Sequence, residues 1–159
     1  MQPKQEDEKM PEAADSLNDV LFKQLQSEAF VLLNTIDAES GGPSSSAISW
    51  VYAVDPKTIR FSVDARSRIV QNVKQNPPVS LVYFGNGTVN AIYGKAEIVT
   101  EALEEVPFKL TCIDVKIEAV RDAMFYGGRI ITEPEFEKTY DKRAAKKLDK
   151  QVFAAMKKA

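Results

Sequence analysis

The stretch from Ile59 to Gly94 constrains the fold most, because its pattern predicts a fixed order of elements. A strand, Ile59 to Val63, runs into a short helix that a Pro-Pro pair ends. A second strand, a Gly-Asn-Gly turn and a third strand follow. The turn before the helix carries Ser67 between Arg66 and Arg68. Since a helix N-terminus has partial positive charge and unpaired N–H groups, this turn suits a phosphate.

The flanking segments predict further strands, joined by short turns. Two precede the central stretch, over Ala29–Asp37 and Ser46–Val54, and one follows it, over Leu110–Val120. Hairpins at roughly ten-residue spacing are typical of an antiparallel barrel or sandwich. Gly94 in the middle of a strand indicates a bend or a close backbone approach.

Alternation predicts which residues of these strands face the core. In the second strand Ile48, Trp50, Tyr52 and Val54 face one way, and Ala47, Ser49, Val51 and Ala53 face the other. In the last strand Ile113, Val115 and Ile117 face inward, and Cys112, Asp114, Lys116 and Glu118 face outward. We therefore expect a mainly β (α+β) fold.

Helices and a tail are expected around these strands. Residues 1–15 are polar and predict a mobile tail, which leaves 16–159 as a single domain. A helix follows Ser16, with Ser16 as N-cap and Asp19 reaching back, and Glu101–Phe108 predicts a short helical connection. The C-terminal helix is expected to begin at Thr132, with Pro134 in its first turn. Its apolar stripe is Phe136, Tyr140, Leu148, Val152, Phe153 and Met156.

Composition excludes several classes of site. The 159-residue chain has no histidine, which excludes His-ligated haem, most zinc sites and His-based triads, so no metal site is expected. Its single cysteine, Cys112, cannot form an internal disulfide and indicates a cytoplasmic protein. The formal net charge of -2 and the absence of a long apolar run favour neither a nucleic-acid nor a membrane partner.

The central stretch resembles the pyridoxamine 5′-phosphate oxidase-like family of FMN-binding split barrels. The resemblance lies in Phe61-Ser62-Val63, Ser67-Arg68, Asn76-Pro77-Pro78-Val79-Ser80-Leu81 and Gly94-Lys95-Ala96-Glu97, and spans roughly Ala29 to Val99. Family members have the same motifs in the same order and at the same spacing. The resemblance implies an antiparallel split β-barrel with flanking helices.

The resemblance also implies a homodimer that binds FMN in a groove between its two chains. By position, Ser67 and Arg68 correspond to residues that hold the phosphate, and Arg66 is a candidate for a second cation there. Backbone contacts to the flavin are expected from Ile48, Ser49, Ser62 and Val63. The function implied is a flavin-dependent oxidoreductase whose substrate is unknown, and no side chain is assigned as the catalytic acid or base.

Several family contacts are replaced in this chain. A phosphate-binding Lys becomes Ile69, an Arg and a Lys of the preceding strand fall on Ala47 and Tyr52, and a Gln from the partner falls on Val89. The Arg-x-His motif of true pyridoxamine 5′-phosphate oxidases has no equivalent here, since the chain has no histidine. An alternative is a flavin-free split-barrel dimer that serves as a non-catalytic ligand-binding or structural module.

Other conspicuous residues have plainer interpretations. Trp50, Tyr52 and Tyr93 are expected to pack in the core or an interface, with flavin contact as the alternative. Met124-Phe125-Tyr126 predicts an exposed aromatic patch at a dimer contact. Cys112 is expected to be unreactive. The carboxylates Asp64, Asp114 and Glu118 have no partner that the sequence identifies.

Overall fold

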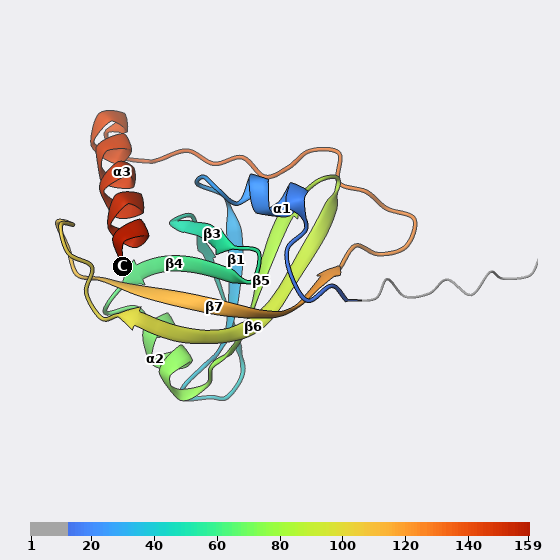
Figure 1. The fold of residues 1–159 in the computed structure, drawn as a ribbon, viewed down its shortest axis with the longest axis horizontal. Coiled ribbons are helices and arrows are strands. Elements are labelled where there is room, and N and C mark those ends of the chain that lie inside the picture. The colour runs from blue at the N-terminus through green and yellow to red at the C-terminus, as the bar shows by residue number, and fades with distance from the viewer. Residues whose placement is uncertain (1–12) are drawn as a thin grey trace, which may run out of the picture.

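Seven antiparallel strands form one curled sheet in a computed structural model that describes residues 13–159 (Figure 1). The strands are β1 (Val31–Ile36), β2 (Pro43–Ile48), β3 (Val51–Asp55), β4 (Thr58–Asp64), β5 (Pro78–Gly85), β6 (Thr88–Thr100) and β7 (Leu110–Asp122). They lie in the order β2-β1-β5-β6-β7-β4-β3. The helices are α1 (Asp19–Gln24), α2 (Arg68–Gln75) and α3 (Lys142–Lys158).

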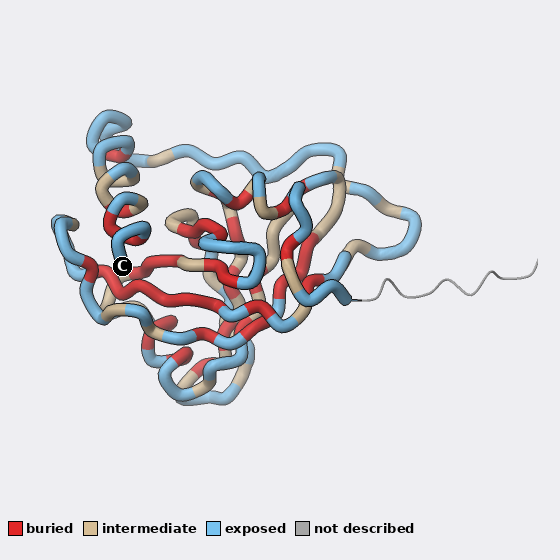
Figure 2. The backbone as a smooth tube through the Cα atoms, viewed as in Figure 1, coloured by how far each residue is buried: buried red, intermediate tan, exposed pale blue. Residues whose placement is uncertain are grey.

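The sheet is a split β-barrel, as the sequence predicts. Side chains from all seven strands meet in one apolar core, which requires the sheet to curl around it. The largest fully buried member is Phe61 of β4. The buried positions follow the strand centres, and the outer turns are exposed (Figure 2). β2 and β3, which are neighbours in the sequence, form the two edges of the sheet.

The predicted order around β4, α2 and β5 is confirmed. Ser67 is the N-cap of α2, and its Oγ accepts a hydrogen bond from the Ile69 N–H at 3.2 Å. Ile69, Val70 and Val73 are buried as expected. Asn72 of the same helix is also fully buried, although a polar side chain is usually exposed.

Gly94 marks a close backbone approach, as expected. A Cβ atom built there would collide with the carbonyl oxygen of Lys116 and would lie 2.8 Å from Cγ1 of Val115. The β6–β7 register also shifts between Tyr93 and Gly94. The bulge therefore lets the long strands β6 and β7 bend around the core.

The strand predicted over Ser46–Val54 is wrong as a single element. The chain breaks between β2 and β3 because β2 pairs with β1 while β3 pairs with β4, at the opposite edge of the sheet. Within β3 the predicted alternation holds, because Val51 and Ala53 lie in the apolar core and Tyr52 packs on the outside of the sheet beneath α3. Ile48 departs from the prediction, because it lies in the core and not on the side of Trp50 and Tyr52.

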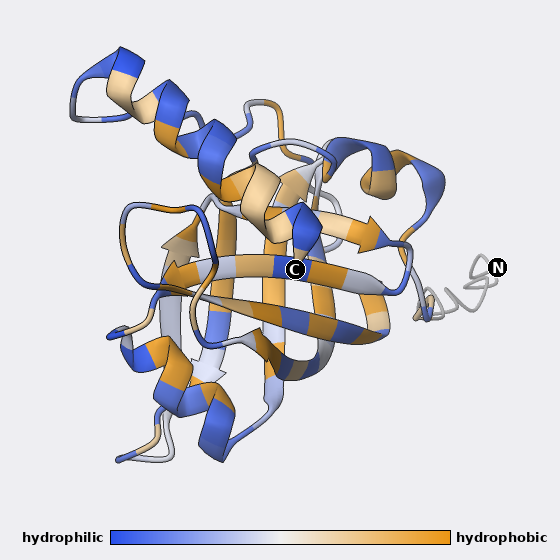
Figure 3. Cartoon of the chain, turned by 60° about the vertical axis from the view of Figure 1, so that its left-hand side comes forward, coloured by the Kyte–Doolittle hydropathy of each residue, from blue (hydrophilic) through white to orange (hydrophobic). Residues whose placement is uncertain are grey.

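The facing predicted for β7 is confirmed, because Ile113, Val115 and Ile117 lie in the core and Cys112 lies on the outside of the sheet. On this outward face Lys116 and Glu118 are exposed, whereas Cys112 and Asp114 are buried. The cause is α3, whose apolar side packs on the outside of β3, β4 and β7. We call the buried residues at this contact the outer cluster. Its members are Tyr52, Leu103, Leu110, Cys112, Val152, Ala155 and Met156, and Trp50, Val106, Leu148 and Phe153 pack against it. Figure 3 shows the mixed hydrophilic and apolar positions on α3.

The C-terminal helix begins later than predicted. Asp141 caps α3, with Oδ1 accepting from the Ala144 N–H at 2.8 Å, so Phe136 and Tyr140 lie before the helix. Residues 123–141 contain neither helix nor strand. This segment is held by tertiary contacts instead, including Phe136 against Phe30, with ring centroids 6.1 Å apart. The rest of the predicted stripe is confirmed, and Val152 and Met156 are fully buried.

Two smaller predictions are also wrong. Asn18, not Ser16, caps α1, and its Oδ1 accepts from the Leu21 N–H at 2.9 Å. Glu101–Phe108 contains turns and bends rather than a helix, and Glu105 takes a left-handed conformation, with φ at 63°. Such a residue interrupts a right-handed helix.

Most of the predicted N-terminal tail lies outside the described residues, since 1–12 are not among them. Ala14, which we placed in the tail, forms an isolated antiparallel bridge with Val120. Its N–H lies 3.1 Å from the Val120 carbonyl, and the Val120 N–H lies 2.7 Å from the Ala14 carbonyl. The chain therefore meets the barrel at this point.

Candidate functional site

The turn between β4 and α2 brings three of the predicted cofactor residues together. Ser67 N–H donates to the Asp64 carbonyl at 2.8 Å, which folds the chain back before the helix begins. The Ser67 Oγ is occupied as the helix cap. Arg66 and Arg68 flank it, with 91% and 71% of their side chains exposed. Two cations thus stand beside the N-terminal end of α2, the arrangement that anion binding favours.

Each of these arginines already faces a carboxylate. Arg66 binds Asp64 through Nε–Oδ1 and Nη2–Oδ2, both at 3.1 Å, and Arg68 Nη1 lies 3.2 Å from Asp37 Oδ2. The hydrogen bonds from Arg66 lower the pKa of Asp64. Asp64 therefore has a partner that the sequence did not identify. The Arg66–Asp64 pair is exposed, and such pairs contribute only about 1 kcal/mol or less, so an incoming phosphate can compete with Asp64. The Arg68–Asp37 pair joins a guanidinium that is 71% exposed to a carboxylate that is only 12% exposed.

Asp37 also shapes the hairpin between β1 and β2. Its Oδ1 accepts from the N–H groups of Ser40 and Glu39, at 2.8 and 3.0 Å. These bonds, followed by the smaller effect of Arg68, hold the pKa of Asp37 below its ordinary value. Arg68 is therefore drawn toward a carboxylate that stays ionised in the folded chain.

The other four predicted residues gather where β2 ends and β4 runs. The Ser62 N–H donates to the Trp50 carbonyl at 3.0 Å, so Ser49 and Ser62 lie near each other. Ile48 and Val63 are buried with side chains in the core, which leaves only their backbone for a ligand. The predicted set thus falls into two groups, connected by the last residues of β4.

Four positions at which the family has polar or charged side chains carry uncharged residues in this chain. Tyr52 is buried, with its ring 6.4 Å from that of Phe153 of α3 in an edge-on arrangement. Burial raises the pKa of Tyr52, so its hydroxyl stays neutral at pH 7. Ile69 belongs to the core, Ala47 is exposed on β2, and Val89 pairs with Phe84 at the end of the β5–β6 hairpin. Among the predicted cofactor residues, only Arg66 and Arg68 carry positive charge.

Sequence reasoning missed a buried ion pair beneath the end of α3. Arg60 of β4 binds Asp114 of β7 through Nε–Oδ1 at 2.7 Å and Nη2–Oδ2 at 3.0 Å. Asp114 therefore has a partner that the sequence did not identify. The hydrogen bonds that Arg60 donates to Asp114 raise the pKa of Arg60. The two residues lie on neighbouring strands, 54 positions apart, and only the strand pairing brings them together.

Ser62 carries a buried hydroxyl whose one neighbour able to share its proton is the thiol of Cys112. The residue is 3% exposed, and its Oγ makes no hydrogen bond to oxygen or nitrogen. It faces Cys112 across the β4–β7 ladder, beside the outer cluster. Burial is the main cause that raises the pKa of the Cys112 thiol, which supports the expectation that this cysteine is unreactive.

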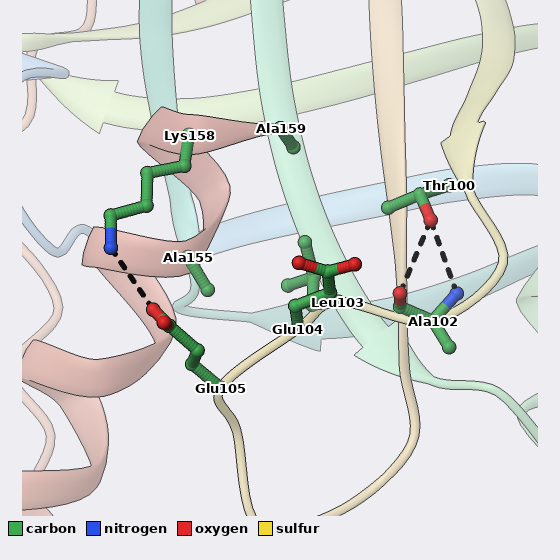
Figure 4. A pocket seen from close by; sticks show the side chains of 8 residues that line it. All are labelled: Thr100, Ala102, Leu103, Glu104, Glu105, Ala155, Lys158 and Ala159. Atoms are coloured by element: carbon green, nitrogen blue, oxygen red, sulfur yellow. Dashed lines mark hydrogen bonds and ion pairs between the residues drawn. The ribbon is translucent and has the colours of Figure 1, made fainter.

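A cavity of about 350 Å³ lies elsewhere, between the β6–β7 connection and the end of α3 (Figure 4). Its lining residues are Thr100, Ala102, Leu103, Glu104, Glu105, Ala155, Lys158 and Ala159. Lys158 and Glu105 close one side with an exposed 3.0 Å ion pair. None of the predicted cofactor residues lines this cavity, so we do not assign it to the site.

Residues 13–159 offer neither a metal cluster nor a membrane-spanning helix. This part of the chain has no group of three or more Cys, Asp or Glu side chains that could hold a metal ion. None of its helices is both long enough and apolar enough to cross a membrane.

The residues present fit a phosphate better than they fit a flavin ring. The β4–α2 turn offers two exposed guanidinium groups at a helix end. The outer face of β3 and β4, next to Ser49 and Ser62, is instead covered by α3. Figure 1 shows the C-terminal end of α3 reaching β4. A flavin held by both groups of predicted residues would meet this helix.

Comparison with known proteins gives the same fold. The sequence profile described as pyridoxamine 5′-phosphate oxidase matches residues 17–122. The structure is similar to a proposed pyridoxamine 5′-phosphate oxidase from Lactobacillus delbrueckii, with a TM-score of 0.55 and 21% identity, over 67% of this chain and 94% of that one. No curated protein matches the chain by sequence.

Two further solved structures have the same architecture. HupZ from Group A Streptococcus has a TM-score of 0.58 and 15% identity, over 73% of this chain and 100% of that one. An F420 reductase has a TM-score of 0.52 and 21% identity, over 62% of this chain and 93% of that one. At these identities the likeness concerns the fold.

Proposed function

Since the chain belongs to the pyridoxamine 5′-phosphate oxidase family, we propose that it binds FMN and acts as a flavin-dependent oxidoreductase. The observation that carries this proposal is the family match over residues 17–122, which contains the whole β4–α2 turn. The F420 reductase of the same fold gives weaker support. The absence of histidine from the chain argues against pyridoxamine phosphate oxidation itself, so the substrate is another molecule.

We assign the phosphate of FMN to the β4–α2 turn. Arg68 provides a charge-assisted hydrogen bond, Arg66 a second, and Ser67 keeps the N-terminal end of α2 in place. Both arginines can turn from Asp64 and Asp37 to a ligand, because their side chains are largely exposed. A phosphate carries more negative charge than either carboxylate, which favours the exchange.

The backbone of four residues would contact the rest of the cofactor. These residues are Ile48, Ser49, Ser62 and Val63, whose backbone contacts do not depend on the side chain. FMN supplies hydride or electron transfer when bound, and the protein contributes binding, orientation and exclusion of water. No side chain is proposed as a catalytic acid or base.

We further propose that residues 16–159 form one domain that works as a homodimer. Phe125 and Tyr126 are 73% and 87% exposed, and such aromatic side chains are common at protein interfaces. They support the predicted dimer contact. The single, buried thiol of Cys112 is consistent with a cytoplasmic protein. Neither nucleic acid nor a membrane is proposed as a partner.

One observation favours a second function, a flavin-free ligand-binding or structural module. Tyr52 stands where the family has a lysine, and it is buried under Phe153. Arg68 and Arg66 are both paired with carboxylates. In this alternative the barrel keeps its fold and its dimer, and the phosphate turn has no ligand.

Titration of FMN into three full-length variants tests the proposal. Loss of a charge-assisted bond costs about 1.5–3 kcal/mol, so Arg68→Ala should weaken FMN binding by roughly ten- to a hundredfold. Arg66→Ala should have a smaller effect, because Arg66 is the more exposed of the two. Arg143→Ala, an exposed arginine of α3, serves as the control. Unchanged FMN affinity in a folded Arg68→Ala protein would remove Arg68 from the site.

A further inference from the structure

α3 lies outside the family match and covers a face that the barrel would otherwise expose. The match ends at residue 122, whereas α3 spans Lys142–Lys158. Val152 and Met156 are fully buried against the outside of β3, β4 and β7. The helix is therefore an addition to the matched barrel, and the outer face of β3 and β4 is buried only because α3 packs on it.

Besides the exposed Lys158–Glu105 ion pair, polar contacts hold α3 at two points. At its C-terminal end, Arg60 Nη1 donates to the carbonyls of Met156 and Ala159, at 2.8 and 3.0 Å. Near its middle, Asp149 Oδ1 accepts from Trp50 Nε1 at 2.9 Å and lies 3.3 Å from Lys138 Nζ. Water can replace these contacts when the helix leaves, which suits reversible docking.

The chain before α3 permits such a movement. Residues 123–141 connect β7 to α3 without any helix or strand. Lys138 and Phe136 anchor this segment to Glu28 and Phe30 just before the helix begins, and Lys138 also pairs with Asp149 of α3. The helix can therefore undock without any change in the strand ladders.

A buried polar atom beside the covered face has only a weak partner. Ser62 Oγ makes no hydrogen bond to oxygen or nitrogen, although the residue is 97% buried, and it has only the Cys112 thiol beside it. Leaving a buried hydroxyl unsatisfied costs free energy that a ligand atom could recover. Trp50, whose carbonyl accepts from the Ser62 N–H, packs against the outer cluster. The unsatisfied atom therefore adjoins the face that α3 occupies.

We infer that α3 is a built-in cover of the flavin face, and that FMN and docked α3 exclude each other. The inference rests on the proposed function. In the covered state Trp50 and Tyr52 contact α3, and only the phosphate turn at Arg68 is accessible. Undocking exposes the β3–β4 face and allows the flavin ring to lie beside Ser62. The chain thus regulates its own cofactor binding.

Two variants that weaken docking, and one control, test this in the full chain. Asp149→Ala removes the partner of Trp50 Nε1, and Val152→Ala removes buried methyl groups of α3. Lys147→Ala changes an exposed position of the same helix. Cys112 is the reporter, because it is the only cysteine of the chain and is fully buried in the outer cluster. Its labelling rate with a maleimide measures undocking, and FMN titration measures cofactor affinity.

The inference predicts that Asp149→Ala and Val152→Ala both label faster and bind FMN more tightly, each by about fivefold or more. Lys147→Ala should match the unchanged protein in both measurements. Circular dichroism establishes that all four proteins are folded.

Two results would overturn the inference alone: equal labelling rates in all four folded proteins, or faster labelling with FMN affinity unchanged. Faster labelling with no FMN binding by any of the proteins would contradict the proposed function as well. The tests of the cover and of the cofactor can therefore fail separately.

Discussion

Arg60 of β4 and Asp114 of β7 form a two-point ion pair, with Nε–Oδ1 at 2.7 Å and Nη2–Oδ2 at 3.0 Å. Only 11% of the Arg60 side chain and 9% of the Asp114 side chain are exposed. The same guanidinium binds two carbonyls at the end of α3. Arg60 therefore links the barrel wall to the helix that covers it.

Removing one partner of this pair should strongly destabilise the protein. Arg60→Leu leaves the Asp114 carboxylate buried without a cation, which costs about 3 kcal/mol or more. Urea unfolding should show a lower midpoint at an unchanged slope. The double variant Arg60→Leu/Asp114→Leu should recover part of the loss, because no buried charge remains. A double variant no more stable than Arg60→Leu would contradict this explanation.

Asn72 should be essential to the packing of α2 on β1. Its Oδ1 accepts from the Ala38 N–H at 2.8 Å, and its Nδ2 donates to Thr35 Oγ1 at 3.0 Å. Asn72→Ala leaves these buried partners unsatisfied, so we expect a loss of about 2–3 kcal/mol in the free energy of unfolding. Gln71→Ala, at the exposed neighbouring position, is the matched control. Equal unfolding midpoints for the two variants would refute the assignment.

A side chain at Gly94 should not be tolerated. The Cβ of Gly94→Ala would collide with the Lys116 carbonyl, which belongs to the strand ladder and cannot move freely. We expect a loss of about 2 kcal/mol or more, as for other overpacked sites. In Gly42→Ala the nearest atom, Ser40 Oγ, lies 3.4 Å away, so this variant should be nearly neutral. Thermal unfolding compares the two, and similar midpoints would argue against the close approach.

Asp37 should contribute to acid unfolding. Its pKa lies below the ordinary value of 3.8 in the folded chain, chiefly because Ser40 and Glu39 donate backbone hydrogen bonds to it. The stabilisation is therefore present above pH 3.8 and is lost as the pH falls through the lower folded value. Asp37→Asn should make stability less dependent on pH in this acidic range. An unchanged acid limb, measured by urea unfolding from pH 2 to pH 6, roughly the range over which carboxylates titrate, would disprove it.

Asp37→Asn should also strengthen FMN binding. It removes the carboxylate that lies 3.2 Å from Arg68 and leaves that guanidinium free for a phosphate. Because the pair is a single 3.2 Å contact and its guanidinium is 71% exposed, the gain should be about two- to fivefold. Asp64→Asn is the parallel change beside Arg66. Weaker FMN binding in folded Asp37→Asn would show that Asp37 holds Arg68 in place for the ligand.

Local signals predicted the centre of the chain well. Ser67 caps α2 because a hydroxyl at a helix start binds a free N–H, and Pro77 ends the same unit because it cannot continue a helix. Gly94 indicated the bulge because only glycine tolerates such an approach. Each of these features is determined by a few residues that are neighbours in the sequence, so it could be predicted without knowing the strand pairing.

Pairings between distant segments were not predictable in the same way. The break at Ser49 arises because β2 and β3 join opposite edges of the sheet, which no local pattern encodes. Cys112 and Asp114 alternate like solvent-facing residues and become buried only when α3 packs on them. The Arg68–Asp37 pair joins residues 31 positions apart. The candidate site residues could therefore be named from the sequence, but the carboxylates that face them and the helix that packs beside them could not.

The most direct measurement is the absorption spectrum of the full-length protein purified without added flavin, repeated after FMN titration and dialysis. We predict flavin bands that reach about one FMN per chain, with a phosphate turn at Ser67 and Arg68 as the anchor. A protein that is colourless as purified and does not retain FMN after dialysis would contradict the central claim. The flavin-free module would then be the better description of this barrel.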